Sequence, residues 1–283
     1  MCDGVRTGTI NAQARTQSSI AVSQDRTDWV LFNASPDILT QIQRCEALQP
    51  ARQLRDSGIR SIVLMDAQID HTTGLLMLRE QQQPLSLWCT APVREDLSEG
   101  NPLLRVLEHY CGVDWQELSF DASAYAIPGA EHVAFTPLPL ISNAPPYSPH
   151  RDQPVDGDTI GMLMTDTVSG KTLFYAPGLG EMEDPVWQAM QQADVVLVDG
   201  TMWTDDEMIQ RGASSKSARS MGHLPQSGPG GMLEWLDKLP KDTRKILIHI
   251  NNTNPILDED SEQRALLTQH GVEVSFDGLE FEI

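Results

Sequence analysis

Short runs of apolar residues, separated by polar loops and amphipathic stretches, recur along most of the chain. Continuous apolar runs lie at residues 62–65, 195–198 and 246–250, the last interrupted only by His249 near its end. Such runs are typical of strands that are buried on both faces of a sheet. Helical patterns lie between them, so the order strand, helix, strand predicts an α/β fold built around these three strands.

The rest of the pattern predicts the outer elements. Further strands are expected at residues 14–22, 29–33, 85–89, 133–140, 160–165, 172–175, 272–276 and 279–283. Helices are expected at residues 38–42, 50–56, 74–80, 91–97, 102–110, 185–190, 232–239 and 258–270. Short polar turns join strands 14–22 and 29–33, and strands 160–165 and 172–175, which predicts two hairpins. Pro137 and Pro139 lack amide donors, so strand 133–140 should lie at an edge or leave the sheet there.

Composition narrows the choice of partners and compartment. The chain has 283 residues, 40% of them apolar, and a net charge of −20, so a globular protein with poor affinity for nucleic acids and anionic membranes is expected. It has no apolar run long enough to cross a bilayer and no secretory signal pattern, which indicates a cytoplasmic location. The four cysteines form no close pair, which suits a reducing compartment.

One polar loop follows the central apolar run. Residues 66–71 place Asp66, Gln68, Asp70 and His71 where a buried strand ends, and loops at this end of a strand commonly bind ligands. Four side chains that can bind a metal therefore lie within six residues. Asp70 and Thr72 are also good helix-capping residues, so the loop alone leaves metal binding and helix capping equally open.

Three more histidines lie in comparable positions. His150, His223 and His249 each lie near the end of a predicted strand or on the loop beyond it, and Asp199 lies at the tip of strand 195–198. A single histidine is more often structural than functional, but several at strand ends can converge on one rim of an α/β fold. The long irregular segment 142–158, which contains His150 and Arg151, is expected to be a loop that covers the site.

The loop also carries a resemblance to a known family. Asp-Ala-Gln-Ile-Asp-His at residues 66–71 resembles the signature His-x-His-x-Asp-His of the metallo-β-lactamase superfamily, with Asp66 and Gln68 in place of the leading histidines. Residues 14–19, 33–37, 68–75, 145–151, 175–180 and 249–258 resemble the pyrroloquinoline quinone (PQQ) biosynthesis protein B family, PqqB. The resemblance implies one domain over residues 1–283, an αββα sandwich in which two mixed β-sheets pack face to face with helices outside.

The departures from the superfamily pattern bear on the metal. A two-zinc hydrolase needs the two leading histidines and a carboxylate that bridges the two ions. In this chain the position of the bridging carboxylate matches Pro177, which cannot bind a metal. The remaining set, Asp70, His71 and His249, has the ligands of non-haem iron(II) oxygenases. The PqqB resemblance likewise implies Fe(2+) at the active site and hydroxylation of the tyrosine ring in a Glu-Tyr unit of a precursor peptide.

Other residues receive supporting roles on this interpretation. His150 and His223 are acid–base candidates, because a hydroxylase must move protons. Asp199 is a third catalytic candidate. Asp66 and Gln68, and also Asp199, are placed to orient the ligating imidazoles or a bound water. Arg151 is a candidate to hold a substrate carboxylate.

The family also has a characteristic beginning. Its members start with a strand and a Cys-x-Cys-x-x-Cys cluster, and Cys2 matches the last cysteine, so the N-terminal strand and the earlier cysteines are expected to be missing here. With a full-length N-terminus, Cys2 should bind a structural Zn(2+).

Two other functions remain open. An older interpretation of the family assigns it the transport of PQQ or its precursor to the periplasm, and the superfamily suggests a metal-dependent hydrolase. The expected partners are a small Glu-Tyr peptide and, as candidates, other PQQ biosynthesis proteins. Nucleic acid and membrane are not expected partners.

Overall fold

The computed structural model describes residues 1–52, 56–121 and 123–283. These residues form two compact units: unit 1 is Met1–Arg15, Leu140–Ser142 and Lys171–Ile283, and unit 2 is Thr16–Pro139 and Asn143–Gly170. The described strands belong to a five-stranded and a seven-stranded sheet. The helix predicted at residues 50–56 includes residues 53–55, so it lies outside the described residues.

The described residues of unit 2 form eight strands and a group of short helices. Its strands are β1 (Ile20–Val22), β2 (Trp29–Phe32), β3 (Ile59–Val63), β4 (Leu85–Cys89), β5 (Val113–Glu117), β6 (Tyr125–Ala126), β7 (Val133–Pro139) and β8 (Ile160–Asp166). Its helices and helical turns are α2 (Ile38–Arg44), η1 (Glu46–Leu48), α3 (Ile69–Thr72), η2 (Thr73–Leu78), α4 (Ala91–Glu95), η3 (Asp96–Gly100) and α5 (Leu103–Leu107).

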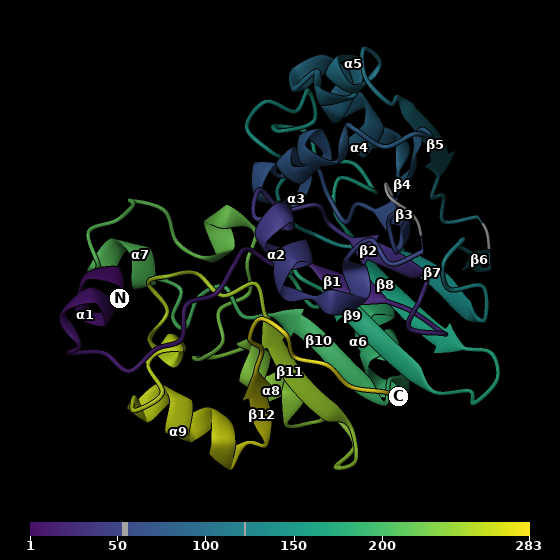
Figure 1. Cartoon of the computed structure of the whole chain (residues 1–283). Helices are drawn as coiled ribbons and strands as arrows, with labels where there is room; N and C mark the ends of the chain where they lie inside the picture. Colours follow the sequence, from purple (N-terminus) through teal and green to yellow (C-terminus); the bar gives the residue numbers. More distant parts are fainter. Residues whose placement is uncertain (53–55, 122) are drawn as a thin grey trace. The chain divides into compact units, whose positions relative to one another are not determined.

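The five-stranded sheet of unit 2 has the order β1-β2-β3-β4-β5, and most residues of β2 and β3 are buried. On one face, Leu31 of β2 joins an apolar cluster with Ile38 of α2, and Figure 1 shows helices α2 to α5 beside these strands. On the other face, the rings of Phe32 and Phe135 of β7 lie 5.8 Å apart. Adjacent residues of a strand point to opposite faces, so β2 contributes to both layers.

Unit 1 contains four strands, flanked by helices. Its elements are α1 (Cys2–Thr7), β9 (Thr172–Ala176), α6 (Asp184–Gln192), β10 (Val195–Asp199), α7 (Glu207–Gln210), η4 (Arg219–Met221), α8 (Met232–Leu236), β11 (Arg244–Ile248), η5 (Pro255–Leu257), α9 (Glu262–Gln269) and β12 (Val272–Val274). Figure 1 shows α9 beside β12, and the two elements are in contact.

Strand β10 explains the apolar run at residues 195–198. It lies between β9 and β11 and is parallel to both, and each of its residues is buried. Asp199 pairs in register with Ile248, the last residue of β11, so the carboxyl ends of two neighbouring strands carry Asp199 and His249. This is the end of a parallel sheet at which binding residues are usually found.

Most of the predicted elements form, but helices α1 and α7 were not predicted and other elements differ from expectation. No strand forms at the described residues 279–283. The Phe281 ring of this segment instead lies 4.5 Å from the Arg244 guanidinium. Strands β5 and β6 were not predicted. The helix expected at residues 74–80 is a 3₁₀ helix, η2. The strand expected at 14–22 is confined to Ile20–Val22, where it forms the predicted hairpin with β2.

The two prolines of β7 lie where they interrupt the fewest hydrogen bonds. Strand β8 pairs with β7 from Val133 to Pro139, whereas β6 pairs only with Ala134 and Phe135. Pro137 and Pro139 therefore lie in the part of β7 that has lost one neighbour, which confirms the expectation from their missing amide donors.

None of the helices in the described part of the chain combines the length and apolar character needed to cross a bilayer.

Candidate metal centre

The loop after β3 holds His71 through a buried carboxylate. The imidazole Nδ1 lies 2.8 and 2.9 Å from the two carboxylate oxygens of Asp66, and both residues are buried. A carboxylate can only accept, so Nδ1 carries the proton and Nε2 carries the lone pair of the neutral ring. That Nε2 lies 3.8 Å from an oxygen of Asp70, a separation that two ligands of one ion can have.

The structure bears on helix capping, one of the two roles that the sequence left open for this loop. Helix α3 begins at Ile69, and its N-cap is Gln68, whose side chain makes no capping bond. The Thr72 hydroxyl donates back to the Gln68 carbonyl, and Asp70 lies inside the first turn. Neither Asp70 nor Thr72 therefore caps the helix through its side chain, although Asp70 in the first turn complements the helix dipole. Metal binding by this loop stays a prediction.

Close backbone packing fixes the position of His71. The Ala34 amide donates to the His71 carbonyl at 2.7 Å, and the Gly74 amide donates to the Ala34 carbonyl at 2.9 Å. A Cβ on Gly74 would collide with the carbonyl oxygen of Ser35, so only glycine allows this approach. The segment after β2 is thereby bonded directly to the segment that carries His71.

In unit 1 a second cluster forms at the ends of β10 and β11. Ligand atoms of Asp199, His223 and His249 all lie within 4.8 Å of one another. His223 Nδ1 lies 2.6 Å from Asp199 Oδ2, and the two imidazole rings are stacked with centroids 5.5 Å apart. Asp199 is fully buried, so its charge is balanced by the groups that surround it.

Those neighbours keep Asp199 ionised. Burial alone would raise the pKa of this carboxyl, but the His223 and His249 imidazoles and the bonds donated by His223 and Thr201 lower it below its usual value. The amides of Leu179 and Thr201 also donate to it, at 3.1 and 2.9 Å. Asp199 is thus a fixed negative charge that stabilises a proton on His223 Nδ1.

His249 adopts a rare backbone conformation. Its φ is +58°, in the left-handed region that a residue with a Cβ seldom occupies. The Thr201 hydroxyl lies 2.9 Å from its carbonyl oxygen and 2.8 Å from its Nδ1, so both ends of the residue contact one side chain. The strained turn places the ring at the end of β11 instead of continuing the strand.

Thr201 was not among the predicted site residues. Its hydroxyl lies 2.5 Å from Asp199 Oδ1 as well as contacting His249, so it links the carboxylate to the imidazole. The available signal was its position two residues after Asp199, at the carboxyl end of a buried strand. The contact itself depends on the pairing of β10 with β11, which the sequence does not reveal.

Four other predicted residues have identifiable contacts, and their functional roles remain predictions. The Gln68 amide donates to the Asn143 carbonyl at 2.9 Å and so ties the metal-binding loop to segment 143–158. In that segment His150 Nε2 lies 3.1 Å from a Glu95 oxygen, and the Arg151 guanidinium donates to the Ala144 carbonyl. Cys2 is exposed on α1, where the Asn252 amide donates to its sulfur at 3.9 Å.

Asp70 and His71 belong to unit 2, whereas His249 belongs to unit 1. The structure brings together Asp66, Asp70 and His71 in unit 2, and Asp199, His223 and His249 in unit 1. That Asp70, His71 and His249 bind one ion therefore remains a prediction. The donor atoms of both clusters are carboxylate oxygens and imidazole nitrogens, which suit iron, manganese or zinc.

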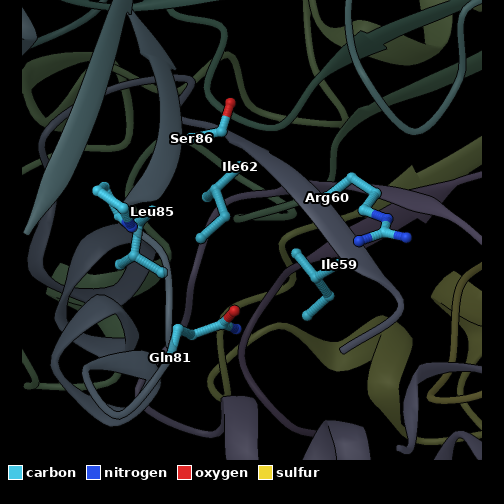
Figure 2. A pocket seen from close by; sticks show the side chains of 7 residues that line it. Ile59, Arg60, Ile62, Gln81, Leu85 and Ser86 are labelled. Carbon is cyan, nitrogen blue, oxygen red and sulfur yellow. The ribbon is translucent and has the colours of Figure 1, made fainter. Parts of the chain in front are cut away.

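A small pocket lies elsewhere in unit 2. Figure 2 shows it between the first residues of β3 and β4, lined among others by Ile59, Gln81 and Leu85, with a volume of about 30 Å³. Asp66 follows the opposite end of β3, and none of the candidate metal-binding residues lines the pocket. The pocket is therefore separate from the candidate centre.

Near His150, a buried carboxyl should make stability depend on pH. Burial, together with the charge of Asp158, raises the pKa of Asp96 to about 6, although Ser148 and His150 lower it and Glu95 adds a further rise. The folded state then binds this proton more tightly than the unfolded state, so stability should fall as pH rises from about 4 to about 6. Asp96→Asn should raise the free energy of unfolding by about 2 kcal/mol above pH 7 and change little near pH 4.

Urea unfolding of both proteins across this pH range would measure the effect of Asp96→Asn. Asp121→Asn, at an exposed position, is the matched control and should leave the profile unchanged. Equal stabilities of Asp96→Asn and the unaltered chain above pH 7 would contradict the expectation.

Comparison with known proteins identifies the family. Residues 28–250 match the beta-lactamase superfamily domain. The chain is 70% identical to Coenzyme PQQ synthesis protein B of Azoarcus sp. (strain BH72), over 98% of this chain and 91% of that protein. Its identity to the Coenzyme PQQ synthesis protein B of Methylobacillus flagellatus is 58%, over 99% of this chain and 92% of the relative.

A solved structure extends the comparison to the fold. The Zn(2+)-bound PqqB from Methylobacterium extorquens superposes with a TM-score of 0.90 at 32% identity, over 100% of this chain and 92% of that chain. The predicted α/β metallo-β-lactamase fold is thereby confirmed. The chain belongs to the coenzyme PQQ synthesis protein B family, within the metallo-β-lactamase superfamily.

Proposed function

We propose that this chain acts in PQQ biosynthesis as an iron(II)-dependent hydroxylase of the tyrosine ring in a Glu-Tyr unit of the precursor peptide. The observation that carries the proposal is that Asp66 is hydrogen-bonded to His71 Nδ1. Asp66 occupies a position where a two-zinc hydrolase has a metal-binding histidine, and here it orients an imidazole instead. The names of the relatives support a role in PQQ synthesis.

The proposed iron ligands are Asp70, His71 and His249. One carboxylate and two imidazoles, without thiolate, suit iron(II) and leave coordination positions for other ligands. The Zn(2+) in the Methylobacterium extorquens relative supports a divalent ion in this family, and zinc would compete for the same donors. When bound, iron(II) would supply the activation of dioxygen.

The side chains of the protein would position the substrate and move protons. A ring carbon that exchanges hydrogen for hydroxyl loses a proton, and His223 is the proposed acceptor because Asp199 stabilises its protonated form. His150, paired with Glu95, is a second acid–base candidate. The Arg151 guanidinium is proposed to hold a carboxylate of the Glu-Tyr unit.

Oxygen consumption by the iron-loaded chain tests the proposal. The chain would be loaded with iron(II) without oxygen and then given a Glu-Tyr peptide, a two-electron reductant such as ascorbate, and dioxygen. We expect one catechol per dioxygen consumed. The second oxygen atom would be reduced to water by two electrons from the reductant and two protons. A zinc-loaded sample is the control and should consume none.

A metal-dependent hydrolase is the second candidate, favoured by the zinc in the relative's structure. Phosphodiester or ester hydrolysis by the zinc-loaded chain, with no catechol from the iron-loaded chain, would establish it in place of the hydroxylase. Tight PQQ binding without oxygen consumption by any metal form would instead indicate transport of PQQ or its precursor.

A further inference from the structure

The Thr201 hydroxyl lies at the centre of the unit 1 cluster. Four polar atoms lie within hydrogen-bond distance of its oxygen: Asp199 Oδ1 at 2.5 Å, His249 Nδ1 at 2.8 Å, the His249 carbonyl at 2.9 Å and His223 Nδ1 at 3.2 Å. Thr201 is 6% exposed, so bulk water has little access to these bonds. Which atom donates in each of these hydrogen bonds is therefore set by the protons on Thr201, Asp199 and the two histidines.

The hydroxyl has a single proton to donate. The ionised Asp199 carboxylate and the His249 carbonyl can only accept, and each lies within donating distance of Thr201. Two oxygens come as close as the 2.5 Å between Thr201 and Asp199 Oδ1 only with a proton between them, so the hydroxyl donates to Asp199 and a lone pair of its oxygen faces His249 Nδ1. A bond across that 2.8 Å contact then requires the proton to be on the imidazole nitrogen.

We propose that Thr201 is a positioning residue that holds the neutral His249 ring in the Nδ1–H tautomer, with its lone pair on Nε2. A histidine in water prefers the opposite tautomer, and the hydrogen bond at one ring nitrogen decides which form is present. The imidazole would then present a lone pair at Nε2 before any metal binds. This tautomer does not depend on the proposed function; only its use for metal ligation does.

His223 provides an internal comparison. Its Nδ1 lies 2.6 Å from Asp199 Oδ2, whereas the Thr201 oxygen is 3.2 Å away. The Asp199 carboxylate therefore accounts for the Nδ1–H form of His223 by itself. Removing the Thr201 hydroxyl should change the tautomer of His249 and leave that of His223 as it is.

Nitrogen NMR of the metal-free chain reads the tautomers directly. With ¹⁵N-labelled histidine at about pH 8, we expect His249 to show Nδ1–H in the unaltered protein. His249→Gln identifies its signals. Thr201→Val should shift His249 to Nε2–H, and Thr201→Ser, which keeps the hydroxyl, should restore Nδ1–H. Zinc binding should weaken about 10- to 100-fold in Thr201→Val and recover in Thr201→Ser.

Two results would overturn the proposal: an Nε2–H His249 in the unaltered protein, or an unchanged His249 tautomer in folded Thr201→Val. The first does not need Thr201→Val, so the proposal is testable even where that variant fails to fold. An Nδ1–H His249 in a chain that does not hydroxylate tyrosine would leave this inference standing and remove the proposed function.

Discussion

Replacing His249 by alanine is expected to abolish high-affinity binding of iron(II) and to reduce tyrosine hydroxylation to the background level. The proposed centre has only three protein ligands, and losing an outer partner of a ligand already weakens metal sites about 10- to 100-fold, so losing the ligand itself should exceed that range. Isothermal titration with iron(II) under anaerobic conditions, followed by the oxygen assay, measures both effects.

His270→Ala is the matched control for this substitution. Its ring lies 2.8 Å from Asp237 and belongs to unit 1, but it is outside the cluster at the ends of β10 and β11. Iron binding and activity should survive in His270→Ala. Retention of the iron affinity and the activity in His249→Ala would remove His249 from the ligand set.

Replacing Asp199 by asparagine should lower both stability and metal affinity. The buried carboxylate accepts hydrogen bonds from the Leu179 amide, the Thr201 amide and hydroxyl, and His223 Nδ1. The amide nitrogen of an asparagine cannot accept a hydrogen bond, so the donors that face it would be left without an acceptor. We expect the free energy of unfolding to fall by about 3 kcal/mol and metal binding to weaken about 10- to 100-fold.

Chemical unfolding and metal titration of Asp199→Asn measure the two losses, with Asp242→Asn as a control at an exposed aspartate. The control should match the unaltered protein in both. Unchanged stability in Asp199→Asn would mean that the carboxylate is not the balancing charge of this cluster.

The sequence was sufficient to locate the strand ends that carry the candidate chemistry. The continuous apolar run at residues 195–198 correctly predicted β10, because a strand buried on both faces needs apolar side chains along its length. The other two runs cover only the last residues of β3 and β11, whose earlier residues include polar side chains. The candidate residues followed from where such strands end: Asp66 and His71 lie after β3, Asp199 is the last residue of β10, and His249 follows β11. Their family resemblance, rather than the pattern, supplied the choice of metal and substrate.

The pattern of apolar and polar residues did not predict the edge strand β5 or the contacts between side chains of neighbouring strands. Strand β5 pairs only with β4, and none of its side chains is fully buried, so no clear hydrophobic period marks it. The contact of Thr201 with His249 joins residues far apart in sequence through the register of β10 and β11. Parallel register depends on packing of the whole sheet, which a local pattern does not contain.

Anomalous diffraction at the iron absorption edge, from crystals of the iron-loaded chain, is the most direct measurement of the proposed centre. We predict one iron ion with Asp70, His71 and His249 as its protein ligands, and with Asp66 still bonded to His71 Nδ1. Two bridged ions, or one ion that none of these three side chains contacts, would contradict the proposed mononuclear site.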